Sequence, residues 1–238
     1  MFPPKEPSLK NMAFCQLVVN HRGLADARRE HAGLPAEERR LAAQWAYDAG
    51  CAASVIGDKL LPFDSERGPC DGAMWALAID PEYGPARLTV GTVEHQLGRR
   101  AEAMSLFSAM ARSRHEMDLS ELVEEAVNFL LDEKDLRAVL ELYEAATQAH
   151  PRVALFWNGL GYAHGKLGQK KQAVEFSRRA AEMEPRNHVF LNDLGWALAE
   201  AGDLAEGEKV LERAVKLSPR SDKVAKINLA DIRRRRSR

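Results

Sequence analysis

The sequence predicts an all-α fold, a solenoid of antiparallel helix pairs. The first observation behind this prediction is a fixed period, because Pro151, Pro185 and Pro219 lie 34 residues apart. Three pairs of small residues repeat at the same spacing: Gly161 and Gly195, Gly168 and Gly202, and Ala180 and Ala214. The second observation is that apolar residues recur at helical spacing in 156–167 and 172–183. One helix pair cannot bury its own apolar face, so we expect neighbouring pairs to stack.

The period divides residues 84–221 into four repeats. Their ranges are 84–119, 120–153, 154–187 and 188–221. In the last two repeats a glycine follows the first helix, where a left-handed residue ends a helix at little cost. A proline then stops the second helix, because it removes a donor and restricts the residue before it. In the second repeat Lys134 replaces the turn glycine.

The segment before the repeats is less regular. Residues 36–83 are predicted to be a degenerate first repeat, with one helix over 36–56 and a second over 72–79. An insertion loop at 57–71, with two prolines and two glycines, would join them. Residues 1–35 are expected to be an N-terminal arm, either frayed or containing a short extra helix.

Residues 222–238 are predicted to be a capping helix with a basic tail. Apolar residues lie on one side of this segment and charges on the other, as expected of a helix that covers the last repeat. The tail holds five arginines, Arg233 to Arg236 and Arg238, in a chain whose formal net charge is -1. Basic residues suit the negative end of a helix dipole, and this explanation is favoured. Contact with nucleic acid, an acidic protein or anionic lipid is the alternative.

The repeat at 154–187 resembles the tetratricopeptide repeat family. It carries Trp157-x2-Leu160-Gly161, followed by Ala173, Ala180 and Pro185. The resemblance covers about residues 70 to 236. It implies a right-handed superhelix in which the first helices line a concave groove. It also implies a non-catalytic scaffold or adaptor that binds an extended peptide or a partner segment.

The resemblance places the second, fifth and ninth residues of each repeat on the groove. In the two best repeats these are Leu155, Asn158 and Tyr162, then Val189, Asn192 and Trp196. The flanking positions are Glu121, Glu124 and Asn128 on one side and Lys223 and Lys226 on the other. Amides suit a peptide backbone, and aromatic rings bury area at a low entropic cost. The alternative is that Tyr162 and Trp196 only pack between neighbouring first helices.

The flanking charges predict a groove that runs from acidic to basic. Members of the family that bind chaperone tails hold a terminal carboxylate with basic residues and asparagines. Here Glu124 occupies a place where such a clamp needs a cation. This argues against that ligand.

Motifs for catalysis are missing from the sequence. It has no His-Glu-x-x-His, no Gly-x-Ser-x-Gly and no phosphate-binding Gly-x4-Gly-Lys-Ser/Thr. We therefore expect no enzyme activity and no cofactor. The candidate metal ligands are Cys15, His21 and His31, with Cys51 or Cys70 as a fourth. Without closely spaced cysteine pairs, ordinary thiols and imidazoles are the favoured interpretation, and no metal is expected.

Cysteine usage and hydropathy predict a cytoplasmic protein. Three cysteines without close spacing favour a reducing compartment. No apolar stretch approaches the roughly 20 residues of a membrane-spanning helix, and the first residues contain no apolar signal segment. We expect a protein or peptide partner and no membrane. The near-neutral net charge argues against nucleic acid as the partner. The alternative function is a nucleic-acid-associated adaptor, and it depends on the basic tail alone.

Overall fold

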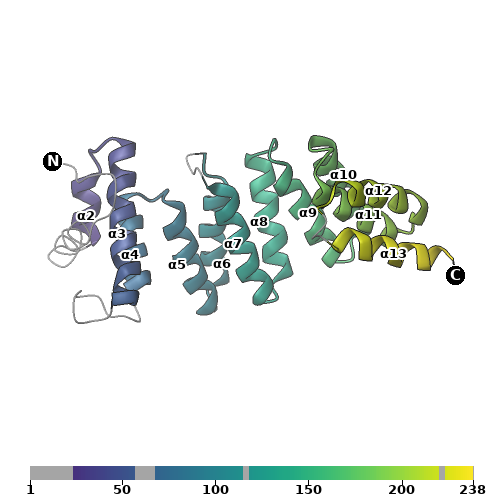
Figure 1. Cartoon of the computed structure of the whole chain (residues 1–238). Helices are drawn as coiled ribbons and strands as arrows, with labels where there is room; N and C mark the ends of the chain where they lie inside the picture. The colour runs from purple at the N-terminus through teal and green to yellow at the C-terminus, as the bar shows by residue number, and fades with distance from the viewer. Residues whose placement is uncertain (1–23, 57–67, 115–117, 220–222, 238) are drawn as a thin grey trace. The chain divides into compact units, whose positions relative to one another are not determined.

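The computed structural model describes residues 24–56, 68–114, 118–219 and 223–237, and within them every regular element is an α-helix (Figure 1). The helices are α2 (Leu24–His31), α3 (Ala36–Ile56), α4 (Gly68–Ile79), α5 (Gly84–Gln96), α6 (Arg100–Ala111), α7 (Leu119–Asp132), α8 (Leu136–Ala149), α9 (Ala154–Lys166), α10 (Lys170–Met183), α11 (His188–Ala201), α12 (Leu204–Leu217) and α13 (Val224–Arg236). The chain forms two compact units, Met1–Ala126 and Val127–Arg238.

Consecutive helices pack in pairs in both units. The pairs are α3 with α4, α5 with α6, α9 with α10, and α11 with α12. In the second unit α11 also packs on α10, and α13 packs on α11 and α12. The all-α fold of helix pairs with a C-terminal capping helix is therefore confirmed.

The core of the second unit shows why small residues recur at the predicted period. Helix α11 contributes buried Phe190, Leu191 and Leu194 to a cluster. Ala180 from α10 and Ala225 from α13 meet these side chains and are almost fully buried. Large residues at these alanine positions would hold the helices apart.

The first helix of each of the four repeats ends in the same left-handed turn. The residues with positive φ are Gly98 (78°), Lys134 (60°), Gly168 (75°) and Gly202 (101°), so their separations equal the repeat lengths. After Lys134, the amide of Asp135 donates to the Leu130 carbonyl at 2.9 Å. The turn is kept where glycine is replaced, so the surrounding repeat imposes it on a residue that disfavours it.

This strained turn gives a stability prediction. We expect Lys134→Gly to raise the free energy of unfolding by about 1 kcal/mol, because a left-handed backbone costs an L-residue energy that glycine avoids. Urea denaturation followed by circular dichroism measures the change. Gly168→Ala is the matched control, since it puts a side chain into the same turn and is expected to destabilise. A Lys134→Gly variant no more stable than the wild type would contradict this account.

The N-terminal region differs from expectation in its helix bounds. Helix α4 begins at Gly68, so residues 68–71 are helical rather than part of the expected loop at 57–71. Pro69 falls in the first turn, where a missing donor does not break a helix hydrogen bond. The remaining loop residues, 57–67, lie outside the described residues. In the arm at 1–35, residues 24–31 form a short extra helix, α2, which packs against α4.

Candidate functional site

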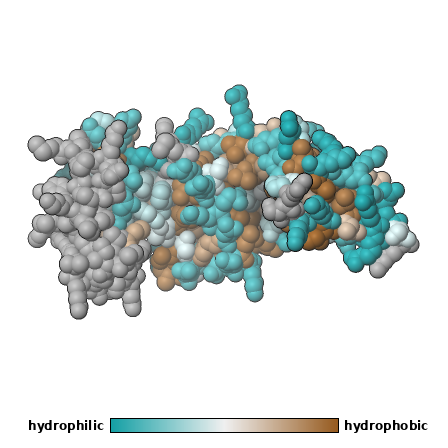
Figure 2. All heavy atoms as spheres, in the orientation of Figure 1, coloured by the Kyte–Doolittle hydropathy of each residue, from teal (hydrophilic) through white to brown (hydrophobic). Residues whose placement is uncertain are grey.

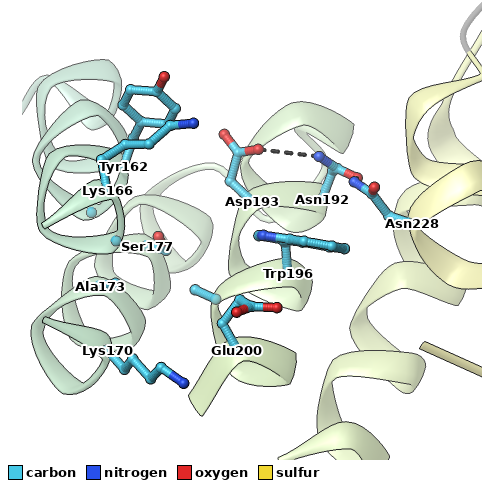
Figure 3. Close-up of a pocket in the computed structure, with 13 residues that line it drawn as sticks. Tyr162, Lys166, Lys170, Ala173, Ser177, Asn192, Asp193, Trp196, Glu200 and Asn228 are labelled. Atoms are coloured by element: carbon cyan, nitrogen blue, oxygen red, sulfur yellow. Dashed lines mark hydrogen bonds between the residues drawn. The ribbon is translucent and has the colours of Figure 1, made fainter. Parts of the chain in front are cut away.

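A cavity of about 410 Å³ lies in the second unit among α9, α10 and α11 (Figure 3). Two of the predicted aromatic residues, Tyr162 and Trp196, line it from α9 and α11. Asn192 of the predicted set lines it too, and Asn228 of α13 adds a further amide. Three of the predicted groove residues are thus brought together around one hollow.

In two other repeats the corresponding space is filled. An ideal Cβ on Gly195 would lie 2.7 Å from Leu211 Cγ, and one on Gly91 would lie 2.6 Å from a ring carbon of Phe107. In each case a large side chain of the second helix occupies the space beside a glycine of the first. These side chains are fully buried. They fill the space between the two helices of the pair.

The third repeat has Ser177 at this place, 34 residues before Leu211. Its side chain faces Gly161, where an ideal Cβ would lie 2.4 Å from Ser177 Oγ. The aromatic residue is one position earlier: Phe176 stacks on Trp157, with the ring centroids 5.8 Å apart. A serine in place of a leucine or phenylalanine leaves space unfilled, and the cavity lies there. The spacing pattern could have revealed this from the sequence.

Small residues widen the cavity along α9 and α10. Gly165 and Ala173 both line it. A Cβ added to Gly165 would meet only the Ala173 Cβ, at 3.7 Å, which is ordinary van der Waals contact. A larger side chain at Gly165 therefore has room, and that room is the cavity.

A buried polar network forms one wall. Asn158 and Asn192 are 8% and 9% exposed. Asn158 Nδ2 donates to Asp193 Oδ2 at 2.7 Å, and Asn192 Nδ2 donates to Asp193 Oδ1 at 3.1 Å. Asn228 Nδ2 donates to Asn192 Oδ1 at 2.9 Å. Burial raises the pKa of the Asp193 carboxyl, and the two amide hydrogen bonds partly offset the rise.

This network gives the two asparagines a role beyond the predicted one. They were expected to offer their amides to a peptide backbone, but Asp193 accepts their hydrogens. The carboxylate does so because it lies inside the wall, where an unpaired charge is costly. Asp193 was missed because it follows Asn192 in the sequence and is therefore not one of the three positions expected to face the groove. The buried Oδ1 of Asn158 has no hydrogen-bond partner in the described part of the chain.

The aromatic rings keep the exposure that a ligand would need. Tyr162 is 41% exposed and Trp196 is 38% exposed. Lys166 Nζ lies 5.2 Å from the Tyr162 ring centroid, and the Arg235 guanidinium lies 6.0 Å from that of Trp196. Packing between first helices alone does not cover either ring.

The acidic residues around the cavity have hydrogen-bond partners, whereas the lysines have no ion-pair partner among the described residues. Lys166 and Lys170 line one side and are exposed, and neither makes an ion pair within the described residues. Across the cavity from the lysines lie Asp193 and Glu200 (Figure 3). Asp193 has its amide donors, and Glu200 accepts from Arg235 at 2.7 Å. Both lysines were missed, although Lys166 follows Tyr162 by four residues and so shares its helix face.

The other predicted groove residues do not line this cavity. Leu155 packs against the core of the second unit, while Val189 is 48% exposed. Lys223 and Lys226 are exposed at the start of α13. On α7, Glu121 and Asn128 are exposed and Glu124 is half-buried. Glu121 and Glu124 belong to the first unit, so the acidic-to-basic course of the groove stays a prediction.

The C-terminal arginines are bound by carboxylates rather than only solvated. Arg233 donates to Glu208 at 2.8 Å and to Glu212 at 2.6 Å. Arg236 also binds Glu208, and these bonds lower the pKa of that carboxyl, with the Arg233 bond as the larger cause. Figure 2 shows hydrophilic residues over much of the end where α13 lies. The residue Arg238 lies outside the described residues.

The predicted metal ligands are not assembled where the structure describes them. His31 Nδ1 lies 2.7 Å from the Ala27 carbonyl oxygen, and burial raises the pKa of the Cys51 thiol. Cys15, His21 and the side chain of Cys70 lie outside the described part. Within that part, no three His, Cys, Asp or Glu side chains form a possible metal site. None of the described helices is long and apolar enough to cross a membrane.

Comparison with known proteins identifies the repeats. The sequence model of the tetratricopeptide repeat matches residues 154–187 and 189–221, which confirms the resemblance. The fold resembles the crystal structure of the MamA protein at 16% identity, covering 74% of this chain and 91% of that one, with a TM-score of 0.50. It also resembles Pseudomonas aeruginosa PilF at 15% identity, covering 84% and 88%, with a TM-score of 0.50.

Identities this low show the fold alone. None of the curated proteins compared with the chain matches it in sequence. Residues 154–187 and 189–221 are thus tetratricopeptide repeats, and the chain has the helix-pair fold of tetratricopeptide-repeat proteins. Such repeats generally serve as protein-interaction scaffolds.

Proposed function

We propose that the chain is a non-catalytic scaffold or adaptor that binds an extended segment of a partner protein in the groove formed by α9 and α11. One observation carries the proposal. Two aromatic rings, Tyr162 and Trp196, each more than one third exposed, line a cavity between the two best tetratricopeptide repeats. Exposed aromatic rings around a hollow are typical of a binding site.

The remaining groove residues take different roles in this proposal. Val189 extends the apolar surface of α11, and Lys223 and Lys226 provide positive charge at the C-terminal side. Asn158 and Asn192 hold the wall rigid through Asp193, so the site needs little ordering when a partner binds. Leu155 supports the groove from the core.

The nucleic-acid alternative has no observation in its favour. It requires arginines that can turn to phosphate groups. Arg233 and Arg236 are bound to Glu208, and Arg235 is bound to Glu200. A phosphate would have to displace these carboxylates.

Removal of the central ring tests the proposed function. We expect Trp196→Ala to weaken partner binding by about 2 kcal/mol, because a large, partly exposed ring at the centre of an interface typically acts as an anchor. The measurement is titration calorimetry with a peptide selected on the wild type, alongside circular dichroism to verify helicity. Leu217→Ala is the control, since Leu217 has the same 38% exposure but does not line the cavity. Equal affinity for the wild type and Trp196→Ala would move the binding site elsewhere.

A further inference from the structure

The part of the cavity beside Ser177 has the character of a hole for one side chain. In the first and fourth repeats a phenylalanine or leucine of the chain itself fills the space beside the helix glycine, and in the third repeat Ser177 does not. The surfaces around the gap include the Trp196 ring, Ala173 and Gly165. A volume of about 410 Å³ lies within the usual range of ligand pockets. An apolar side chain from outside would complete the packing that the other repeats achieve internally.

The charge around the hole favours one kind of neighbour for that side chain. Lys166 and Lys170 have no carboxylate partner among the described residues, so an acidic group can bind them without displacing another carboxylate. A basic group would have to compete with Arg235 for Glu200, or with buried amides for Asp193. Unpaired cations facing satisfied carboxylates therefore select for an acidic ligand.

We infer that the cavity binds a partner peptide by one large apolar side chain, aromatic or branched, inserted beside Ser177, with an acidic residue next to it that pairs with Lys166 and Lys170. This inference rests on the proposed function and specifies its ligand. It places recognition in a gap of the third repeat. The asparagine positions expected from the sequence hold the wall through Asp193.

Two substitutions fill the part of the cavity beside Ser177 without overpacking the helices. Ser177→Leu reproduces the residue that lies at the corresponding place of the fourth repeat, Leu211, beside its own helix glycine. Gly165→Leu fills the cavity from α9, where a Cβ has ordinary contact distance. Both variants are expected to melt at or above the wild-type temperature, because they bury apolar surface in a space that is already present.

The test uses a random peptide library displayed on phage and selected on the full chain. We expect enriched peptides to share a Phe, Trp, Leu or Ile beside Asp or Glu. A synthetic consensus peptide, measured by fluorescence anisotropy, should lose at least tenfold in affinity with Ser177→Leu and with Gly165→Leu. Reversing the charge of both lysines, Lys166→Glu with Lys170→Glu, should cost at least tenfold as well. Lys209→Glu with Lys216→Glu, which reverses two exposed lysines outside the cavity, is the charge-matched control and should have little effect.

Three other outcomes are possible, and each refutes at least one part of the inference. Enriched peptides that need the open cavity but carry no acidic residue would refute the ligand class and leave peptide binding intact. Peptides that bind Ser177→Leu as well as the wild type would refute the cavity as the site. A library that yields no peptide above background would refute both the inference and the proposed function.

Discussion

Replacing Gly195 with leucine is expected to lower the free energy of unfolding by about 3 kcal/mol. A Cβ at this position would lie 2.7 Å from Leu211 Cγ and 3.1 Å from the Gly207 carbonyl oxygen. The Leu211 side chain can shift, but the Gly207 oxygen belongs to the backbone of α12 and can move only if that helix moves. The two helices of the fourth repeat must therefore separate. Chemical denaturation of the purified variant measures the loss.

Gly161→Leu is expected to act in the same way in the third repeat. There an added Cβ would lie 2.9 Å from the Ser177 amide nitrogen and 3.2 Å from the Ala173 carbonyl oxygen. Gly165→Leu is the matched control, because it makes the same change one helical turn further along α9, where there is space. Unchanged melting of both the Gly161 and Gly195 variants would show that the repeat register is wrong.

Replacing Asp193 with alanine is expected to cost about 2 to 3 kcal/mol of stability. The carboxylate accepts hydrogen bonds from Asn158 and Asn192, and both asparagines are buried. Without it, their amide hydrogens lose their partners in a place that water reaches poorly. Asp193→Asn is the milder comparison, because its amide oxygen still accepts one of the two bonds. A loss below about 0.5 kcal/mol for Asp193→Ala would contradict the role given to this wall.

The same carboxylate gives a pH dependence with a definite sign. Burial raises its pKa in the folded state above the ordinary value of 3.8. The folded protein therefore binds this proton at a higher pH than the unfolded chain does. As the pH falls from about 7 to about 4, the wild type should gain stability relative to Asp193→Asn, which cannot take up the proton. A stability difference between the two that is independent of pH would refute this assignment.

The period in the sequence predicted the helix pairs, because prolines and glycines end helices by local backbone rules. Helices α9 and α11 begin at Ala154 and His188, the first residues of the last two predicted repeats. The start of α4 was missed by four residues, since a Gly-Pro pair is compatible both with a loop and with a first helical turn.

The site was predicted less completely, because it depends on what packs beside each groove residue. The resemblance to the repeat family placed Tyr162, Asn192 and Trp196 on the groove, and these three residues line the cavity. Which groups satisfy the asparagines depends on tertiary contacts, so the acceptor role of Asp193 could not be read from the helix face. The cavity itself depends on the small size of Ser177 compared with its counterparts. The period alone aligns Ser177 with Leu211, so the small residue could have been noticed from the sequence, whereas the contacts show that the space beside it is lined as a cavity.

Helix α13 couples the C-terminal end of the chain to the cavity. Asn228 of this helix bonds to the cavity wall, and Arg235, two turns later, bonds to Glu200 and lies near Trp196. The cap of the solenoid and one side of the cavity are therefore the same structural element. Fraying of the C-terminal helix removes part of the site, and by linkage a ligand held there suppresses that fraying. Because salt weakens the exposed arginine pairs, we expect higher ionic strength to lower the affinity of the proposed ligand by loosening the C-terminal helix.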